Sequence, residues 1–177
     1  MTVSLTAGLC ACTTYNNFKN AFFDDGKEAQ ERTIKIGVFE PLSGKNKTEG
    51  NEELMGIELA HDLYPTVCGK KVELVYGDNK SDIYTGETVI QELISANSPS
   101  VILGSYGETL TLIAGKYAKA NNIPAITISS TNPLITTNND YYFSATYSET
   151  RQGDALADFA YTSQKKIVAA AVKTEDD

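Results

Sequence analysis

The stretch SVILGSYGETLTLIAGKYAKANNIPAITIS, residues 100–129, contains the alternation that decides the fold class. Residues 100–104 and 123–129 are short apolar runs rich in β-branched side chains, which is typical of buried strands. Between them, four side chains recur at the spacing of one helix face: Leu110, Ile113, Ala114 and Tyr117. A strand, a helix and a second strand in this order predict a βαβ unit with parallel strands.

The same alternation precedes this unit. Residues 33–39 and 70–78 read as strands, and each is followed by a segment of helical period. The inner face of the first helix is predicted to be Gly56, Leu59, Ala60 and Leu63, with Pro65 ending the helix and His61 on the solvent side. The second helix is predicted to begin at a cap, Ser81 or Asp82, and to bury Val89, Ile90, Leu93 and Ile94.

Downstream, residues 141–146 predict a fifth strand. A further helix is predicted to present one face made of Gln152, Ala155, Leu156, Phe159 and Ala160. Residues 165–172, KKIVAAAV, look like another buried strand. That strand would either close the edge of the sheet or open a second domain. From residue 33 onward the sequence therefore predicts an α/β fold with a doubly wound, mostly parallel sheet.

Composition narrows the function. The chain has 177 residues, of which 41% are hydrophobic and 21% charged, as expected of a globular protein. Its formal charge is −8 and it has no basic cluster, which argues against nucleic acid as a partner. A single histidine and three cysteines without metal-ligand spacing predict no metal site. Because no glycine-rich phosphate motif or nucleophile elbow is present, we expect neither a cofactor nor an enzyme.

The N-terminus, MTVSLTAGLCAC, is apolar and uncharged, and its end resembles the lipobox of bacterial lipoproteins. That resemblance implies cleavage before Cys12 and lipidation of its thiol, which would anchor the chain to a membrane. Residues 1–12 would then be the signal segment and residues 13–32 a polar tether. The alternative is a disordered tail with two incidental cysteines. Cys68 would remain as a free, buried thiol.

Six strings carry a wider resemblance, in this order: IKIGVFEPLSG, GNEELMGIELA, GKKVELVYGDNKSD, VILGSYGETL, NNIPAITISSTNPLIT and YYFSATYSETRQGDALADFA. Together they make residues 33–172 similar to the N-terminal lobe of type I periplasmic binding proteins, in the branch of leucine/isoleucine/valine receptors. The resemblance implies a ligand-binding lobe over residues 33–163. It also implies that residues 164–177 begin a second lobe.

The family's ligand site falls first on the turn after the third predicted strand. The resemblance places Tyr106, Glu108 and Thr109 there, with the backbone N–H groups of Glu108 and Thr109 and the Thr109 hydroxyl binding a carboxylate. A helix N-terminus favours an anion on physical grounds, because its first N–H groups are unpaired and carry partial positive charge. An alternative for Glu108 is an outward position in the first helical turn, where its charge favours the helix dipole.

The second part of the implied site follows the fourth predicted strand. Ser129, Ser130 and Thr131 would supply carbonyl and hydroxyl groups to the ligand's ammonium, although the adjoining Asn132-Pro133 also reads as a turn. Tyr147 and Glu149 complete the implied set. Glu149 would help to position the ligand or the hinge, or would cap the next helix.

The predicted function is that of an extracytoplasmic solute-binding lipoprotein of an ABC importer. It would close two lobes over an amino acid or a similar small solute and deliver that solute to permease subunits. A sensing module of the same fold, which signals to a partner and transports nothing, is the alternative from another class. A flavodoxin-like or Rossmann enzyme is disfavoured, because EPLSGKNKTEG follows the first strand where a phosphate loop would be needed.

Overall fold

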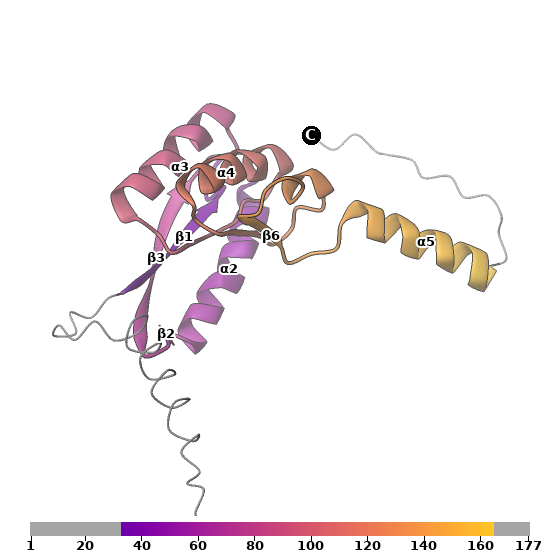
Figure 1. Cartoon of the computed structure of the whole chain (residues 1–177), viewed down its shortest axis with the longest axis horizontal. Coiled ribbons are helices and arrows are strands. Elements are labelled where there is room, and N and C mark those ends of the chain that lie inside the picture. Colours follow the sequence, from indigo (N-terminus) through magenta and orange to yellow (C-terminus); the bar gives the residue numbers. More distant parts are fainter. Residues whose placement is uncertain (1–32, 165–177) are drawn as a thin grey trace, which may run out of the picture. The chain divides into compact units, whose positions relative to one another are not determined.

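The computed structural model describes residues 33–164. Strands and helices alternate along the chain as the sequence predicts (Figure 1). The elements are β1 (Ile34–Glu40), α2 (Lys47–Leu63), β2 (Thr66–Val67), β3 (Lys70–Asp78), α3 (Ile83–Asn97), β4 (Val101–Leu103), α4 (Glu108–Asn121), β5 (Ala125–Thr127), the 3-10 helix η1 (Pro133–Ile135), β6 (Tyr142–Ser144) and α5 (Glu149–Gln164).

The six strands form one sheet in the order β2-β3-β1-β4-β5-β6. All neighbouring pairs are parallel except β2 and β3, which form a short antiparallel hairpin. The order runs outward from β1 in both directions, which is the arrangement of a doubly wound sheet. The predicted fold class is therefore confirmed. The hairpin strand β2 is an element that the sequence pattern did not predict.

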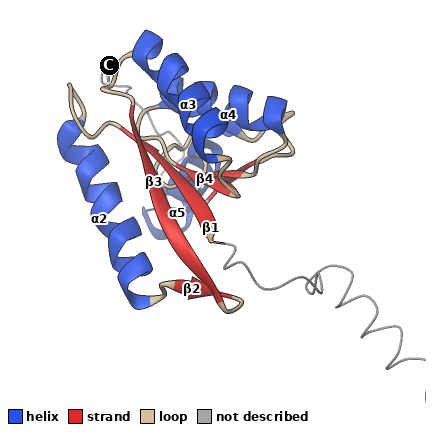
Figure 2. Ribbon diagram, turned by 90° about the vertical axis from the view of Figure 1, so that its left-hand side faces the viewer, coloured by secondary structure: helices blue, strands red, loops and turns tan. Residues whose placement is uncertain are grey.

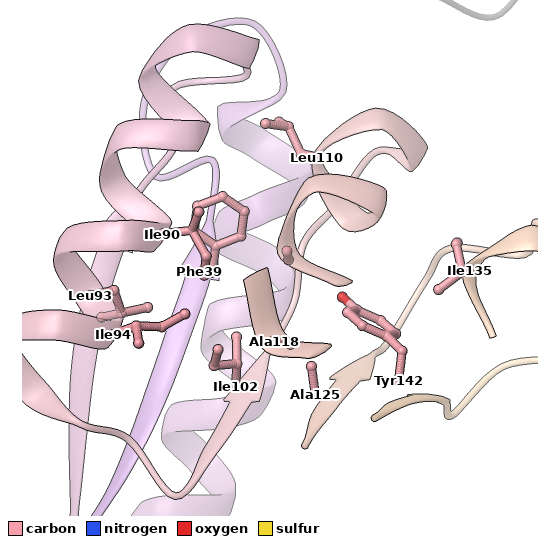
Figure 3. Close-up of a cluster of buried hydrophobic side chains, with 11 residues drawn as sticks. Phe39, Ile90, Leu93, Ile94, Ile102, Leu110, Ala118, Ala125, Ile135 and Tyr142 are labelled. Carbon is pink, nitrogen blue, oxygen red and sulfur yellow. The ribbon is translucent and has the colours of Figure 1, made fainter. Parts of the chain in front are cut away.

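Helices cover the sheet from both sides. Figure 2 shows α2 on one side of the sheet and α3 with α4 on the other. The hydrophobic core lies between the sheet and the α3–α4 pair (Figure 3). Its innermost side chains are completely buried: Phe39, Ile90, Ile102, Ala114, Ala118 and Ala125. The predicted inner faces of these two helices are confirmed, since Leu93, Ile94 and Leu110 are buried with them.

Local signals set the ends of the helices. The Asp82 carboxylate caps α3 by accepting a hydrogen bond from the Thr85 N–H at 2.7 Å, which satisfies one of the unpaired donors of the first turn. Ser81, the other candidate for this cap, instead accepts a hydrogen bond from the Asn46 N–H at 2.9 Å. The first predicted helix ends at Leu63, two residues before Pro65, as expected.

The predicted inner face of α2 is wrong for its two leucines, whereas Gly56 and Ala60 line a groove between α2 and the sheet. Leu59 and Leu63 are 60% and 64% exposed, and the buried residues of the helix are Gly50 and Ile57. The cause lies at the start of the helix, where Gly50 packs so closely that a Cβ atom would lie 2.4 Å from the Pro41 carbonyl oxygen. That contact fixes the rotation of α2, so Ile57, seven residues later, faces the sheet and the leucine stripe faces away.

Two other expectations need correction. Cys68 is free, as predicted, but it is exposed in the turn between β2 and β3. His61 is half-buried, and its Nε2 lies 3.2 Å from the Val72 carbonyl oxygen. The reason in both cases is the β2–β3 hairpin, which extends the sheet beyond the end of α2.

The predicted inner face of α5 is uncovered, because Leu156 and Phe159 are 68% and 58% exposed. The predicted lipidation site Cys12 and the predicted strand at 165–172 lie outside the described residues. Within residues 33–164, no helix combines the length and apolar character needed to cross a membrane.

Candidate ligand-binding site

The turn between β4 and α4, residues 104–107, stands at the carboxyl edge of the parallel sheet. Gly104 and Gly107 have φ angles of 104° and 90°, a region that side-chain-bearing residues rarely adopt. A Cβ atom on Gly104 would lie 2.2 Å from the Glu40 Oε1 atom and 2.3 Å from the Phe39 carbonyl oxygen. The glycine therefore allows the turn to sit directly against the end of β1.

Buried hydrogen bonds hold this turn. The Asn79 side-chain amide donates to the Ser105 hydroxyl at 2.8 Å. The Thr111 hydroxyl lies 2.6 Å from the Ser105 carbonyl oxygen and donates to it. From β6, the Tyr142 hydroxyl donates to the Gly104 carbonyl oxygen. Because these partners come from several elements, the turn is fixed by the whole lobe.

The β4–α4 turn leads directly into the N-terminal end of α4. Thr111 is the first residue of this helix whose N–H donates to a preceding carbonyl, that of Gly107, at 3.0 Å. The N–H groups of Glu108 and Thr109 have no partner within the helix, which makes this end attractive to an anion. Thr109 is exposed there, so its hydroxyl is accessible.

Glu108 takes the outward position that the sequence offered as an alternative. It is exposed in the first turn of α4, and its carboxylate accepts a hydrogen bond from the Asn132 side chain at 3.2 Å. This bond joins α4 to the loop after β5, residues 128–132. Asn132 also accepts from the Leu134 N–H at 2.9 Å and thereby begins η1, as its turn signal predicts.

The loop after β5 brings hydroxyl groups to the same edge. Ser130 is only 7% exposed, and its Oγ has no hydrogen-bond partner among the described residues. Its N–H donates to the Thr127 hydroxyl at 3.2 Å, which fixes the backbone at this point. A buried hydroxyl without a partner is costly, so this serine favours a polar ligand at the site.

Tyr147 and Glu149 lie farther along the chain, at the approach to α5. Tyr147 is 76% exposed, and Glu149 is the first residue of the helix. The Glu149 N–H donates to the Thr131 carbonyl oxygen at 3.0 Å, which connects the start of α5 to the loop after β5. The ligand-binding role of these two side chains stays a prediction.

A groove of about 710 Å³ lies between α2 and the sheet. Its walls are mostly apolar and include Ile36, Leu74, Leu103, Ile128 and Ala60. At one end it is lined by polar side chains of α2 and of the two turns just described, namely Glu49, Glu53, Tyr106 and Ser129. The predicted residues Tyr106 and Ser129 thus meet at one end of a single concave surface.

Sequence reasoning missed an acidic pair beneath these turns. Glu40, the last residue of β1, is completely buried, and its Oε2 accepts a hydrogen bond from the Tyr106 N–H at 2.8 Å. Burial, and then the charge of neighbouring Glu53 on α2, raise the pKa of Glu40 to about 9. Burial likewise raises the pKa of Glu53. A glutamate at the buried end of a mostly apolar strand was the available signal.

Among residues 33–164, no group of three or more histidine, cysteine or acidic side chains is arranged to hold a metal ion. The site therefore consists of a helix N-terminus, buried hydroxyls and a carboxyl pair. These groups suit a small polar solute. A sequence model of the periplasmic binding protein family matches residues 33–176. The chain belongs to the periplasmic binding protein family.

Relatives in sequence and in structure agree with this assignment. The Leu/Ile/Val-binding protein homolog 2 of Brucella abortus (strain 2308) is 24% identical over 139 residues, which cover 77% of this chain and 35% of that protein. The leucine-binding protein LivK of Thermotoga maritima has 31% identity and a TM-score of 0.68, over 75% of this chain and 38% of LivK.

Two further solved structures contain ligands. LivJ of Streptococcus pneumoniae, in complex with isoleucine, is 28% identical with a TM-score of 0.67, over 76% of this chain and 39% of LivJ. A solute-binding protein of an ABC transporter from Rhodopseudomonas palustris BisB5, in complex with 3,4-dihydroxybenzoic acid, is 25% identical with a TM-score of 0.67. That match covers 74% of this chain and 36% of the relative.

This binding-protein chain spans less than two fifths of the length of these relatives. The relatives are solute-binding proteins and not enzymes, in agreement with the sequence prediction. Membership of the family implies an extracytoplasmic location. The shared portion contains β1, β4 and β5 with the turns that follow them, so the candidate site lies within the matched residues.

Proposed function

We propose that this periplasmic binding protein binds a small carboxylate-bearing solute, an amino acid or a close analogue, at the carboxyl edge of β4 and β5. The observation that carries the proposal is the unpaired, 7% exposed hydroxyl of Ser130 beside a turn that presents the N-terminus of α4. The Ser130 hydroxyl can bind a polar atom of the ligand, and the N–H groups at the start of α4 can donate hydrogen bonds to an anion.

The two turns suit different parts of an amino acid. The ligand carboxylate would accept hydrogen bonds from the N–H groups of Glu108 and Thr109 and from the Thr109 hydroxyl. Its ammonium would be received by the oxygen-rich segment Ser129, Ser130 and Thr131. Isoleucine and dihydroxybenzoic acid, the ligands in two of the related structures, share only the carboxylate. That comparison supports the α4 end as the contact common to both.

In the whole protein, α5 and residues 164–177 would lead into a second lobe that closes over the ligand. We propose that the closed form delivers its solute to the permease subunits of an ABC importer. Cys12 would carry the lipid that anchors the protein outside the membrane. The 7% exposed Ser130 and the α4 terminus would then form one half of the closed site.

A thermal-shift screen of the twenty amino acids and of hydroxybenzoates tests this proposal on the full-length gene product. A ligand at about 100 times its Kd stabilises the folded state by about 2.7 kcal/mol. That stabilisation raises the unfolding midpoint by at least about 2 °C. Thr109→Val should make the shift clearly smaller, because it replaces the hydroxyl by a methyl group and removes one of the hydrogen bonds proposed to the ligand carboxylate. Thr88→Val, at another exposed helical threonine, is the matched control and should retain it.

Absence of any shift across both ligand classes would contradict binding of a carboxylate-bearing solute and would favour the sensing module. A shift of the same size in Thr109→Val and in the wild type would instead place the site elsewhere. Ser130→Ala provides a second probe, since it removes the unpaired buried hydroxyl without changing the volume greatly. It should weaken binding while leaving the unliganded protein at least as stable.

A further inference from the structure

The carboxyl groups of Glu40 on β1 and Glu53 on α2 are neighbours, beside the β4–α4 turn and the loop after β5. Glu40 Oε2 is paired with the Tyr106 N–H, and Glu40 Oε1 lies against Gly104, where a Cβ atom would be 2.2 Å away. Glu53 and Ser129 line the adjoining groove. The pair therefore touches the β4–α4 turn and reaches toward the β5–η1 loop.

If both Glu40 and Glu53 were charged, most of their carboxylate oxygens would lack hydrogen-bond donors. Glu40 Oε1 and both Glu53 oxygens are buried without a hydrogen-bond partner among the described residues. Two adjacent negative charges removed from water repel each other and lose their hydration. One proton would remove the conflict, because a protonated Glu40 Oε1 could donate to Glu53 and would leave a single negative charge.

Burial disfavours the charged form of both carboxyl groups, and Glu40 is the completely buried one. Each also has one neighbour that favours its charged form, the Tyr106 N–H for Glu40 and the Ser129 hydroxyl for Glu53. The Ser129 hydroxyl lies near Glu53 without closing a hydrogen bond of normal geometry, and it can turn to donate to the second Glu53 oxygen. With a proton between the two carboxyl groups and the Ser129 hydroxyl turned toward Glu53, a continuous chain would run from the Tyr106 N–H through Glu40 and Glu53 to Ser129.

We propose that Glu40 and Glu53 hold one proton between them, and that this bridged pair positions both ligand-binding turns. The positioning role rests on the function proposed above, whereas the shared proton does not. Glu40 and Glu53 are positioning residues, since they act through Tyr106 and Ser129. Loss of the proton breaks the bridge and adds a negative charge beneath the proposed carboxylate site, so affinity for an anionic group should fall as pH rises.

Several other ionisable groups of the described residues face the pair or line the groove beside it. From β6, Tyr142 faces Glu40; burial, then the charges of Glu40 and Glu53, raise its pKa, so it stays protonated. From α2, Glu49, Glu52 and His61 line the groove. From β3, Asp78 is engaged by the Ser43 hydroxyl at 2.6 Å.

The first test needs no ligand. The pKa of Glu40 is about 9 in the folded protein and near its ordinary value of 4.5 when the chain is unfolded. Its contribution to stability is therefore complete below pH 4.5 and is lost as pH rises toward 9. In this window the unfolding constant should increase by up to about tenfold per pH unit. Chemical denaturation of the full-length gene product at several pH values measures the slope.

Glu40→Gln replaces the proton with an amide that can donate to Glu53 and accept from the Tyr106 N–H. It should therefore flatten the slope between pH 6 and about 9. Glu58→Gln, at an exposed position of α2, the helix that carries Glu53, should leave the slope unchanged. Infrared spectroscopy of the wild type should show a protonated-carboxyl C=O band at neutral pH that is lost in alkali. Absence of that band, or a slope retained in Glu40→Gln, would overturn the shared proton.

The second test addresses positioning. Hydrogen exchange at the Tyr106 amide, corrected for intrinsic pH dependence, should accelerate in the wild type as the carboxyl pair loses its proton, and should not do so in Glu40→Gln. Any solute found by thermal shift should lose affinity by up to about tenfold per pH unit in the wild type only. Exchange and affinity that change equally in both proteins would contradict the positioning role. A screen without any ligand contradicts the proposed function alone, because the infrared and exchange measurements need no ligand.

Discussion

The two faces of the sheet are built differently. Toward α3 and α4, Phe39 and Ile102 are completely buried in a dry core. Toward α2, Ile36 and Leu74 line an open groove and Phe143 is 54% exposed. The comparison indicates that the first face supplies most of the hydrophobic stabilisation. The second face carries the carboxyl pair and the polar end of the candidate site.

The geometry of the layers explains the difference. Neighbouring strands lie about 4.8 Å apart, and a helix with its side chains is about 10 Å wide, so one helix covers about two strands. On one face, α3 and α4 pack against each other. The Leu110 side chain of α4 occupies the space that a side chain at Gly86 of α3 would need. On the other face, α2 packs against β1, and a groove remains between this helix and the sheet.

The largest expected change in stability comes from truncating a phenylalanine to alanine on each of the two faces. Phe39→Ala should destabilise the protein by about 3–5 kcal/mol, because it removes a buried ring and leaves a cavity. Phe143→Ala should cost less than about 1 kcal/mol, since half of its ring is already in water. Urea denaturation of the two variants measures both values. Similar losses would contradict the division between a packed and an open face.

A smaller effect should come from Asp78, which joins the sheet to the loop before α2. Its carboxylate accepts hydrogen bonds from the N–H groups of Leu42 and Ser43, at 3.0 and 3.1 Å. Burial works to raise the pKa of Asp78, but hydrogen bonds from Ser43, Lys80 and Leu42 outweigh it and hold the pKa below its usual value. The α2 face is thus held by polar contacts where the other face is held by packing.

Asp78→Asn should therefore destabilise the protein by about 1–2 kcal/mol at neutral pH. Because the folded-state pKa is lowered, the carboxylate stabilises above the unfolded value of 3.8. This contribution is lost as pH falls through the folded value, so the difference between variant and wild type should shrink in acid. Denaturation at pH 7 and near pH 3 tests it. A difference that stays constant would show that the charge does not matter.

The smallest effect should come from two helical glycines, with opposite signs. Gly56→Ala on α2 should stabilise by about 0.5–1 kcal/mol, because no atom lies within 4 Å of the added Cβ. Gly86→Ala on α3 should destabilise by about 1 kcal/mol, since its Cβ would lie 2.6 Å from the Leu110 Cδ2 atom in the core. Thermal unfolding resolves the two signs. A gain in both variants would mean that the α3–α4 contact is loosely packed.

Much of the fold was predictable because its signals are local. Strands with apolar runs, the Asp82 cap and the end of α2 before Pro65 depend on residues that are neighbours in the chain. The rotation of α2 was not predictable, because Gly50 meets Pro41 through the tertiary structure and overrides the leucine stripe. A pattern along one helix shows which residues share a face, and a contact with another element decides which face turns inward.

The candidate site divides in the same way. Glycines and hydroxyls at the strand ends mark the two turns in the sequence, since parallel strands bring their carboxyl ends to one edge. Only the tertiary structure brings Glu40 and Glu53 together from β1 and α2. The sequence by itself determined the α/β class and the turns. Folding decided the burial and the shared surroundings of the carboxyl pair, because desolvation and repulsion depend on groups that are distant along the chain.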